Sequence, residues 1–190
     1  MKRSLFAAAA AALVILLAGC GQPGATAPAS SASASDSGGV APAGGDIPDN
    51  QVYLTYTGSA FTIKYPEGWV QAARGDGVTF QDKDNRIAVT VSQGPAPSSS
   101  SVSGNIRAIN GATITTAARG ITLPSGPAIA ATYQVDGQAD AVTGKKPRLT
   151  VDRYELSGSG GRRAVIELAN RVGADNLDAY RLIVESFRWR

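Results

Sequence analysis

Apolar and polar side chains alternate with a period of two through most of the chain from Gln51 onward. This is the pattern of β-strands that bury one face. Turn-forming residues, mainly glycine, proline, serine and aspartate, separate the alternating runs. The runs that we interpret as strands are 52–57, 61–65, a strand that begins at 69–70, 78–80, 87–91, 121–123, 129–135, 149–156 and 164–168.

Two pairs of these runs predict β-hairpins. The runs 78–80 and 87–91 flank Asp82-Lys83-Asp84-Asn85, which we interpret as a turn because it lacks the glycine and the distal glutamate of an EF-hand loop. The runs 149–156 and 164–168 flank a glycine- and serine-rich turn. The apolar phase slips between Val151 and Tyr154, which predicts a β-bulge there.

Helical periodicity is clearest near the C-terminus. Leu177, Tyr180, Val184 and Phe187 form one apolar stripe, preceded by Asp175, a residue type that caps helices. We expect this helix to cover the sheet, because an antiparallel sheet with one apolar face needs a second layer. The segment 93–104 has the composition of a polar loop. Residues 105–114 are ambiguous, because helical spacing there runs into β-branched residues.

The N-terminus has the anatomy of a secretory signal. Lys2-Arg3 precede an uncharged run from Leu5 to Leu17, which is shorter than the roughly 20 residues that span a bilayer. The run ends in Leu17-Ala18-Gly19-Cys20, which resembles the bacterial lipobox. That resemblance implies cleavage before Cys20, acylation of its thiol, and attachment to the extracytoplasmic face of the cell membrane.

A low-complexity segment of glycine, alanine, serine and proline follows Cys20. It contains too few large apolar residues to offset the entropy of ordering, so we expect a disordered tether. The sequence leaves open whether the tether carries O-linked sugar. The expected organisation is therefore a signal peptide at 1–19, the lipidated cysteine and tether at 20–50, and a folded domain at 51–190.

The residue inventory restricts the chemistry. Histidine is absent, and Cys20 is the single cysteine, so a disulfide within the chain is excluded, as is histidine-based acid–base or metal chemistry. The carboxylates Asp152, Glu155 and Glu167 fall on one predicted hairpin, where strand-face acids are common. We therefore predict no catalytic residues, no metal site and no cofactor.

The charge does not indicate nucleic-acid binding. After residues 1–19 are removed, sixteen basic and fifteen acidic side chains remain, a net charge of +1. The basic groups Lys145-Lys146-Arg148 and Arg162-Arg163 lack an accompanying helix or aromatic series, so we interpret them as solvated surface. Lys145 follows Gly144, but the remainder of a phosphate-binding loop is missing.

A succession of short motifs across 51–190 resembles the PsbP-like family, in particular its small bacterial lipoproteins. The motifs are Phe61-x-Ile63-x-Tyr65-Pro66-x-Gly68-Trp69, Val78-x-Phe80, Leu123-Pro124-x-Gly126-Pro127-Ala128, Val142-Thr143-Gly144-Lys145, Arg153-Tyr154, Gly173-Ala174-Asp175-Asn176-x-Asp178 and Ser186-Phe187-Arg188-Trp189. The resemblance implies an α+β domain, an antiparallel sheet of about six or seven strands covered by helices. It also implies a role in docking on partners rather than in catalysis.

Three functions follow as hypotheses. The first is a non-catalytic surface lipoprotein that binds an envelope protein, with the loops 93–104 and 136–147 as the expected contact surface. The second is a carrier of a small ligand or lipid, which would need a large apolar cavity. The third, an enzyme, is disfavoured because a serine nucleophile would lack a histidine base.

Overall fold

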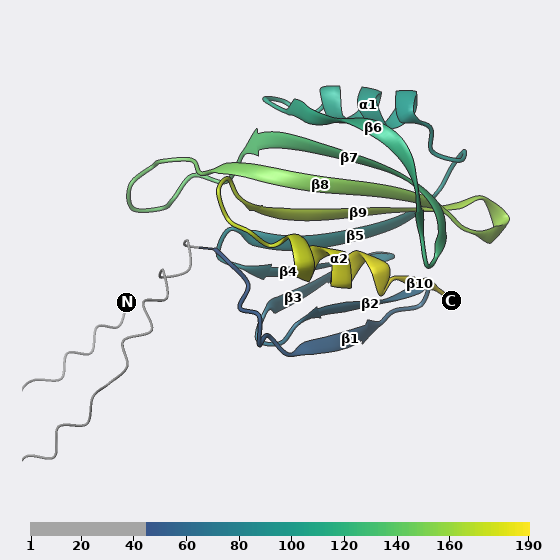
Figure 1. Ribbon diagram of the computed structural model, residues 1–190, viewed down its shortest axis with the longest axis horizontal. Helices are drawn as coiled ribbons and strands as arrows, with labels where there is room; N and C mark the ends of the chain where they lie inside the picture. Colours follow the sequence, from purple (N-terminus) through teal and green to yellow (C-terminus); the bar gives the residue numbers. More distant parts are fainter. Residues whose placement is uncertain (1–44) are drawn as a thin grey trace, which may run out of the picture. The chain divides into compact units, whose positions relative to one another are not determined.

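The computed structural model describes residues 45–190, of which 51% lie in strands and 14% in helices. Figure 1 shows the strands arranged in two antiparallel sheets. The smaller sheet has the order β1-β2-β10, and the larger has the order β3-β4-β5-β9-β8-β7-β6. The strands are β1 (Tyr53–Thr57), β2 (Phe61–Pro66), β3 (Val70–Arg74), β4 (Gly77–Asp82), β5 (Asn85–Gln93), β6 (Thr113–Leu123), β7 (Gly126–Asp136), β8 (Arg148–Ser157), β9 (Arg162–Arg171) and β10 (Arg188–Trp189).

The predicted α+β fold, one sheet of about six or seven strands covered by helices, is wrong. The part of the chain that the structure describes holds three strands in one sheet, seven in another, and only two α-helices, α1 (Ser99–Arg107) and α2 (Leu177–Glu185). A short 3₁₀ turn, η1 (Ser159–Gly161), joins β8 to β9. The error arose because alternation identifies strands but does not say which sheet each one joins.

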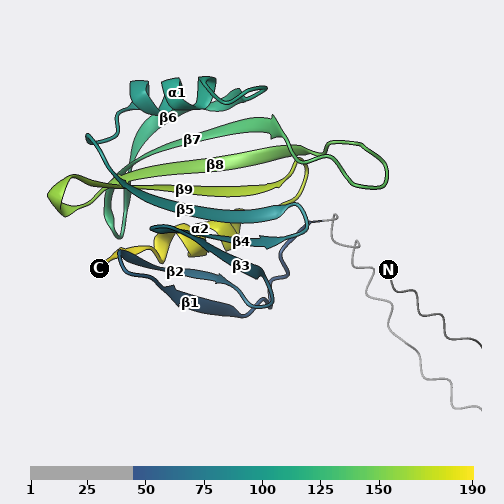
Figure 2. The same cartoon turned by 180° about the vertical axis from the view of Figure 1, so that it is seen from behind.

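The main core lies on one face of the seven-stranded sheet, beneath α2 and the three-stranded sheet. Tyr65 of β2 stacks on Phe80 of β4 with ring centroids 4.1 Å apart, and Phe61 stacks on Phe187 at 5.5 Å. Figure 2 shows β1, β2 and α2 on the same side of β5. The small sheet thus supplies much of the cover that the sequence analysis assigned to helices.

A second core lies on the opposite face, where α1 packs on β6 and β7. Val102 and Ile106, one helical turn apart, are fully buried against a cluster that includes Ala131, Tyr133 and Val151. The Ser98 hydroxyl accepts from the Ser101 N–H, and the Ser101 hydroxyl accepts from the Ser98 N–H, in a reciprocal capping box. The prediction that all of 93–104 is a loop is therefore wrong from Ser99 onward.

The predicted bulge in β8 is also wrong. Val151 and Tyr154 keep an unbroken register with both β7 and β9. The apolar phase slips because both faces of β8 are covered: Val151 faces the α1 side, whereas Tyr154 and Leu156 face the main core. The irregular register instead lies in β6, between Ile114 and Thr116 and between Thr116 and Arg119.

The predicted C-terminal helix exists as α2, but its buried stripe differs from the expectation. Tyr180, Ile183 and Val184 are buried, whereas Leu177 is 73% exposed. Phe187 is fully buried but lies beyond the helix. The N-cap residue is Asn176 rather than Asp175, although the Asp175 carboxylate accepts a long bond from the Leu177 N–H at 3.4 Å.

The chain enters the described domain at Gly45. Asn85 and Asn176 both donate to the Gly45 carbonyl, at 2.7 and 3.1 Å, and the Ile47 N–H donates to the Asn176 side chain at 2.6 Å. Ile47 itself is buried in the main core. The predicted signal peptide, Cys20 and most of the predicted tether lie outside the described residues. Within 45–190, no helix is long and apolar enough to cross a membrane.

Candidate functional site: an arginine surface at the C-terminal end

The two loops predicted to form a contact surface lie at opposite ends of the seven-stranded sheet. Gln93 at the end of β5 pairs with Arg162, the first residue of β9. Asp136 at the end of β7 pairs with Arg148, the first residue of β8. Because β8 and β9 are antiparallel, their first residues lie at opposite ends of the sheet. The loops 93–104 and 136–147 therefore do not converge on one site. Each end of the sheet has to be considered as a separate surface.

The end that carries the C-terminus brings Arg162 of β9 next to the C-terminal segment, which carries Arg188 and Arg190. Arg162 Nη1 donates to the main-chain oxygen of Arg190 at 2.9 Å, and Arg190 Nη1 donates to the carbonyl of Gly58 at 2.8 Å. Arg188 Nη1 donates to the carbonyls of Glu185 and Phe187 at 2.6 and 2.7 Å. We call Arg162, Arg188 and Arg190 the C-terminal arginine surface.

These three guanidinium groups are positioned without neutralisation by an acidic side chain. Their hydrogen-bond partners are main-chain oxygens, together with the Ser159 hydroxyl in the case of Arg162. None of the three pairs with an acidic side chain within residues 45–190, although Arg86, Arg148, Arg153 and Arg171 do. Since a guanidinium has five N–H donors, the exposed side chains of Arg188 and Arg190 keep donors available to an incoming anion.

Trp189 fixes the geometry of this surface. The Arg162 guanidinium carbon lies 5.1 Å from the centroid of the Trp189 ring. The Phe187 ring also contacts Trp189, edge-on, with the ring centroids 5.1 Å apart. A side chain at Gly158 would approach Trp189 to 2.9 Å, so the absence of a β-carbon there leaves room for the indole. The turn between β8 and β9 is thereby held against β10.

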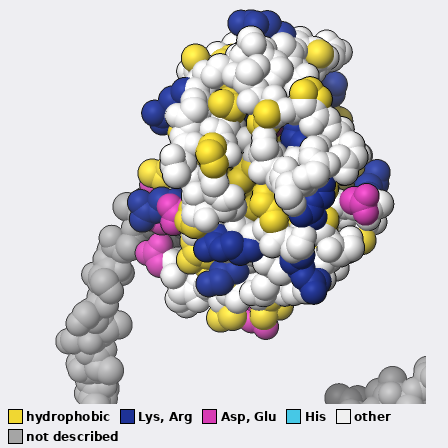
Figure 3. Space-filling view, turned by 90° about the vertical axis from the view of Figure 1, so that its right-hand side faces the viewer, with side chains coloured by type: hydrophobic (Ala, Val, Ile, Leu, Met, Phe, Trp, Pro, Cys, Tyr) yellow, Lys and Arg dark blue, Asp and Glu magenta, His cyan; other side chains and the backbone are white. Residues whose placement is uncertain are grey.

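The space-filling view of this end in Figure 3 shows Lys and Arg side chains over its centre and Asp and Glu side chains toward its margins. A hollow of about 270 Å³ lies beside Arg162, lined by Ser59, Ala60, Asp76 and residues 91–93. The hollow is bounded by the β1–β2 turn, the β3–β4 turn and the end of β5. The surface thus combines fixed cations with a concave region beside them.

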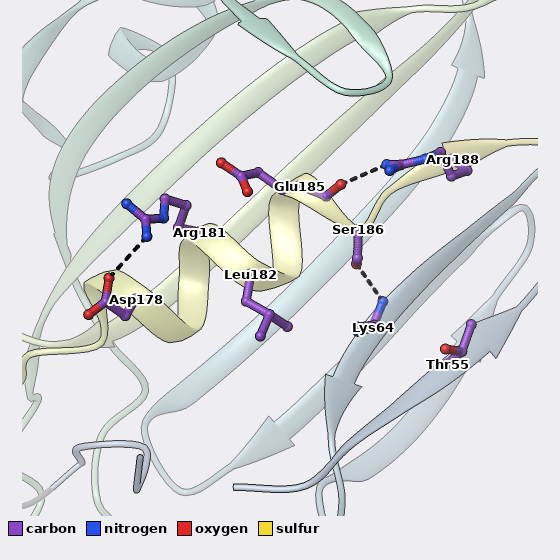
Figure 4. Close-up of a pocket in the computed structure, with 8 residues that line it drawn as sticks. All are labelled: Thr55, Lys64, Asp178, Arg181, Leu182, Glu185, Ser186 and Arg188. Atoms are coloured by element: carbon purple, nitrogen blue, oxygen red, sulfur yellow. Dashed lines mark hydrogen bonds and ion pairs between the residues drawn. The ribbon is translucent and has the colours of Figure 1, made fainter. Parts of the chain in front are cut away.

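A second depression, of about 780 Å³, lies between α2 and the three-stranded sheet and includes Arg188 (Figure 4). The Lys64 N–H donates to the Ser186 hydroxyl at 2.8 Å, which ties β2 to the end of α2. Arg181 and Asp178 form an exposed ion pair at 3.6 Å on the helix. Lys64 and Glu185 add one charge of each sign, so the lining of this depression is mixed in charge around Arg188.

The structure brings together two of the three carboxylates considered for catalysis, and the third lies elsewhere. Glu155 and Glu167 lie on the α1 face of the sheet, where both accept from Arg153 at 2.7 to 2.8 Å. Asp152 lies on the opposite face and accepts from the Thr132 hydroxyl at 2.8 Å. Burial raises the pKa of Asp152 above its usual value. Two of the three acids are thus ion-paired, and the third is separated from them by the sheet.

The described residues contain no group of three His, Cys, Asp or Glu side chains placed to hold a metal ion. The sequence pattern predicts no binding role for Arg188 or Arg190, and it indicates solvated surface at Arg162. The sequence around each single arginine contains no motif that indicates a binding site. Arg162 and Arg190 are 28 residues apart in the sequence and meet in the folded chain, where β9 lies in the seven-stranded sheet and β10 in the three-stranded sheet.

Comparisons with known proteins give no family for this chain. No family model matches it, and no curated protein is detectably similar. Among solved structures, the chain is similar to a protein from Bacteroides thetaiotaomicron VPI-5482, at 15% identity and a TM-score of 0.44, covering 73% of this chain. The match spans about half of that chain, 48% of its length. The resemblance to the PsbP-like family therefore stays a prediction from the sequence.

Proposed function

We propose that this chain is a lipid-anchored, non-catalytic domain of the cell envelope that binds an acidic protein partner at the C-terminal arginine surface. Anchoring at Cys20 rests on the lipobox-like sequence alone. The binding role rests on one observation: Arg162, Arg188 and Arg190 are held by main-chain oxygens and have no acidic side-chain partner within residues 45–190. Carboxylates of a partner are the groups that complement them.

The chemistry of arginine favours a carboxylate-bearing partner. A guanidinium presents a planar fork of donors that matches a carboxylate with two parallel hydrogen bonds. The hydrogen bonds to Gly58, Glu185 and Phe187 orient the forks of Arg188 and Arg190 before binding, which reduces the entropy lost on association. The adjacent hollow of about 270 Å³ offers space for a side chain of the partner.

A carrier of a small apolar ligand is the alternative function, and the structure offers it less support. The space between the two sheets is filled by fully buried side chains, among them Phe61, Phe80 and Phe187. The hollows described above are lined largely by polar and charged groups. A carrier would require these packed aromatic rings to separate.

Crosslinking in the native membrane tests the proposed function. A photo-crosslinking residue at Ser59, beside Arg162, should capture a protein, whereas the same residue at Thr115 on the exposed edge strand β6 should not. Arg188→Gln with Arg190→Gln should reduce the Ser59 adduct to background. Arg107→Gln with Arg119→Gln removes the same charge elsewhere and should leave the adduct unchanged.

Three outcomes would contradict the proposal. Equal capture after Arg188 and Arg190 are replaced would show that the arginines do not bind the partner. A captured molecule that remains undigested after protease treatment of the adduct would identify an anionic polymer rather than a protein. Turnover in a broad hydrolase screen that survives stringent repurification would replace binding with catalysis.

A further inference from the structure

The opposite end of the domain carries a groove of about 1130 Å³ beneath the loop 137–147. This loop protrudes beyond the sheet at the left of Figure 1. The groove is lined by six cationic and three anionic side chains: Lys83, Arg86, Lys145, Lys146, Arg148 and Arg171, with Asp84, Asp136 and Asp140. The two ends of the domain are thus both basic, but they differ in what surrounds the charges.

Each carboxylate of this groove already has a partner. Asp84 pairs with Arg171 at 2.6 Å, and Asp136 pairs with Arg148 at 3.0 Å. Asp140 accepts from the N–H and the hydroxyl of Thr143 and from the Val142 N–H, and these bonds hold the pKa of Asp140 below its usual value. Within residues 45–190, Lys83, Lys145 and Lys146 form no ion pair. The three lysines outnumber Asp140, the one lining carboxylate whose hydrogen-bond partners are uncharged, so the groove keeps a net positive charge.

Apolar side chains accompany these lysines on the surface. Val142, in the protruding loop, is 92% exposed, and Val172, on the groove wall, is 43% exposed. Exposure of a valine side chain to water is unfavourable, because apolar surface is more stable when it is removed from water. Apolar side chains flanked by lysine are the combination that contacts the headgroup region of an anionic bilayer, where the valine enters the acyl boundary and the ammonium groups meet lipid phosphates.

The chain also enters the domain at this end. Gly45 is held by Asn85 and Asn176, and Asn85 lies two residues from Lys83 of the groove. If Cys20 carries the proposed lipid and the 25 residues before Gly45 have the flexibility that their composition predicts, their root-mean-square reach is about 25–30 Å. A tether of that length would hold the groove end near the membrane surface.

We propose that the loop 137–147 is a second membrane contact, which docks on anionic lipid headgroups through Lys145, Lys146 and Val142. The contact would orient the domain with its C-terminal arginine surface directed away from the bilayer. It goes beyond the proposed partner site, and it uses the proposed anchor only as the means of holding the domain near lipid.

A fluorescence measurement tests this contact on the full chain purified from membranes. A polarity-sensitive fluorophore is placed at Ala141→Cys beside Val142, or at Ser159→Cys at the opposite end as a control. The protein is then incorporated into phosphatidylcholine vesicles with or without phosphatidylglycerol. The emission maximum of the label at position 141 should shift to shorter wavelength only when the vesicles contain phosphatidylglycerol. High salt should restore the original wavelength, because it screens the charge attraction. The emission at position 159 should not change.

Charge-matched variants make the test specific. Lys145→Gln with Lys146→Gln should lower the affinity of the loop for anionic vesicles roughly 10- to 30-fold. Lys64→Gln with Arg107→Gln should leave that affinity unchanged, and Val142→Ser should reduce the blue shift. Equal emission in the two kinds of vesicle, or equal shifts at both labels, would overturn the proposal. A shift produced by inorganic phosphate without vesicles would assign the groove to small anions instead.

The measurement also separates this proposal from the others. Sedimentation with pure phosphatidylcholine vesicles reports the lipid anchor, because the loop gains no charge attraction there. The vesicles contain no partner protein, so the result does not depend on the arginine surface. Loss of sedimentation with neutral vesicles, together with a retained shift in anionic vesicles, would contradict the anchor and support the loop contact.

Discussion

Arg153 Nη2 lies 2.7 Å from Glu155 Oε1, in an ion pair whose glutamate side chain is completely buried. The same guanidinium reaches Glu167 Oε1 at 2.7 Å on the neighbouring strand, and Tyr133 donates its hydroxyl to that oxygen at 2.9 Å. Glu155 Oε2 lies 3.4 Å from Arg163 Nε, a contact without hydrogen-bond geometry. Arg153 is therefore the group that neutralises a buried charge on the α1 face.

Replacing Arg153 should destabilise the domain strongly. Arg153→Met leaves Glu155 buried with only the poorly oriented Arg163 beside it, and we expect a loss of about 3–5 kcal/mol in the free energy of unfolding. Urea denaturation measures the change. The double variant Arg153→Met with Glu155→Met removes both charges and should recover most of the loss. A single-variant loss below about 1 kcal/mol would show that water reaches Glu155.

Phe187 should be among the residues on which the two-sheet core depends. Its side chain is fully buried between Phe61 and Trp189, so Phe187→Ala should cost about 3–5 kcal/mol. Leu177→Ala, at a position that is 73% exposed, should change stability by less than about 0.5 kcal/mol. Thermal or urea unfolding of the two variants makes the comparison. Similar losses at both positions would contradict the observed burial.

The pH dependence of stability should report Asp152. Burial raises the pKa of Asp152 in the folded state, so the folded chain binds this proton more readily than the unfolded chain, whose value is about 3.9. The contribution of Asp152 to stability therefore falls as the pH rises from about 3.9 through the higher folded-state pKa, and it is least favourable at neutral pH. Asp152→Asn keeps an oxygen for the Thr132 hydroxyl and removes the charge.

We expect Asp152→Asn to raise the urea midpoint at neutral pH and to lose this advantage as the solution is acidified below the folded pKa. Thr132→Val, which removes the hydroxyl that hydrogen-bonds the carboxylate, should have the opposite effect at neutral pH. A gain from Asp152→Asn that is independent of pH would show that the charge is not its cause.

The proposed membrane anchor depends on a single atom, the sulfur of Cys20. Cys20→Ser removes the proposed acceptor of the acyl chain, so the protein should leave the membrane fraction or accumulate with the proposed signal peptide intact. Membrane fractionation and the intact mass of the N-terminus measure this outcome. Unchanged fractionation together with an unchanged mass would exclude lipidation at this position.

Local patterns in the sequence predicted local structure well. The hairpins β4–β5 and β8–β9 and the helix α2 are confirmed, because alternation, turn residues and an apolar stripe act over a few neighbouring residues. The helix α1 was missed because its cap uses Ser98 and Ser101 within a serine-rich run, and its buried face has only Val102 and Ile106. Such short signals are hard to separate from a polar loop.

The sequence by itself determined which segments pair as hairpins, that histidine chemistry is absent, and that one lipobox-like cysteine precedes a tether-like segment. Only the tertiary structure decided that β2 pairs with β10 rather than with β3, which divides the strands between two sheets. Other long-range contacts place Arg162 beside Arg190 and Gly45 beside Asn85, 28 and 40 positions apart. Contacts of this kind depend on how whole sheets stack, and no local pattern of side chains encodes them.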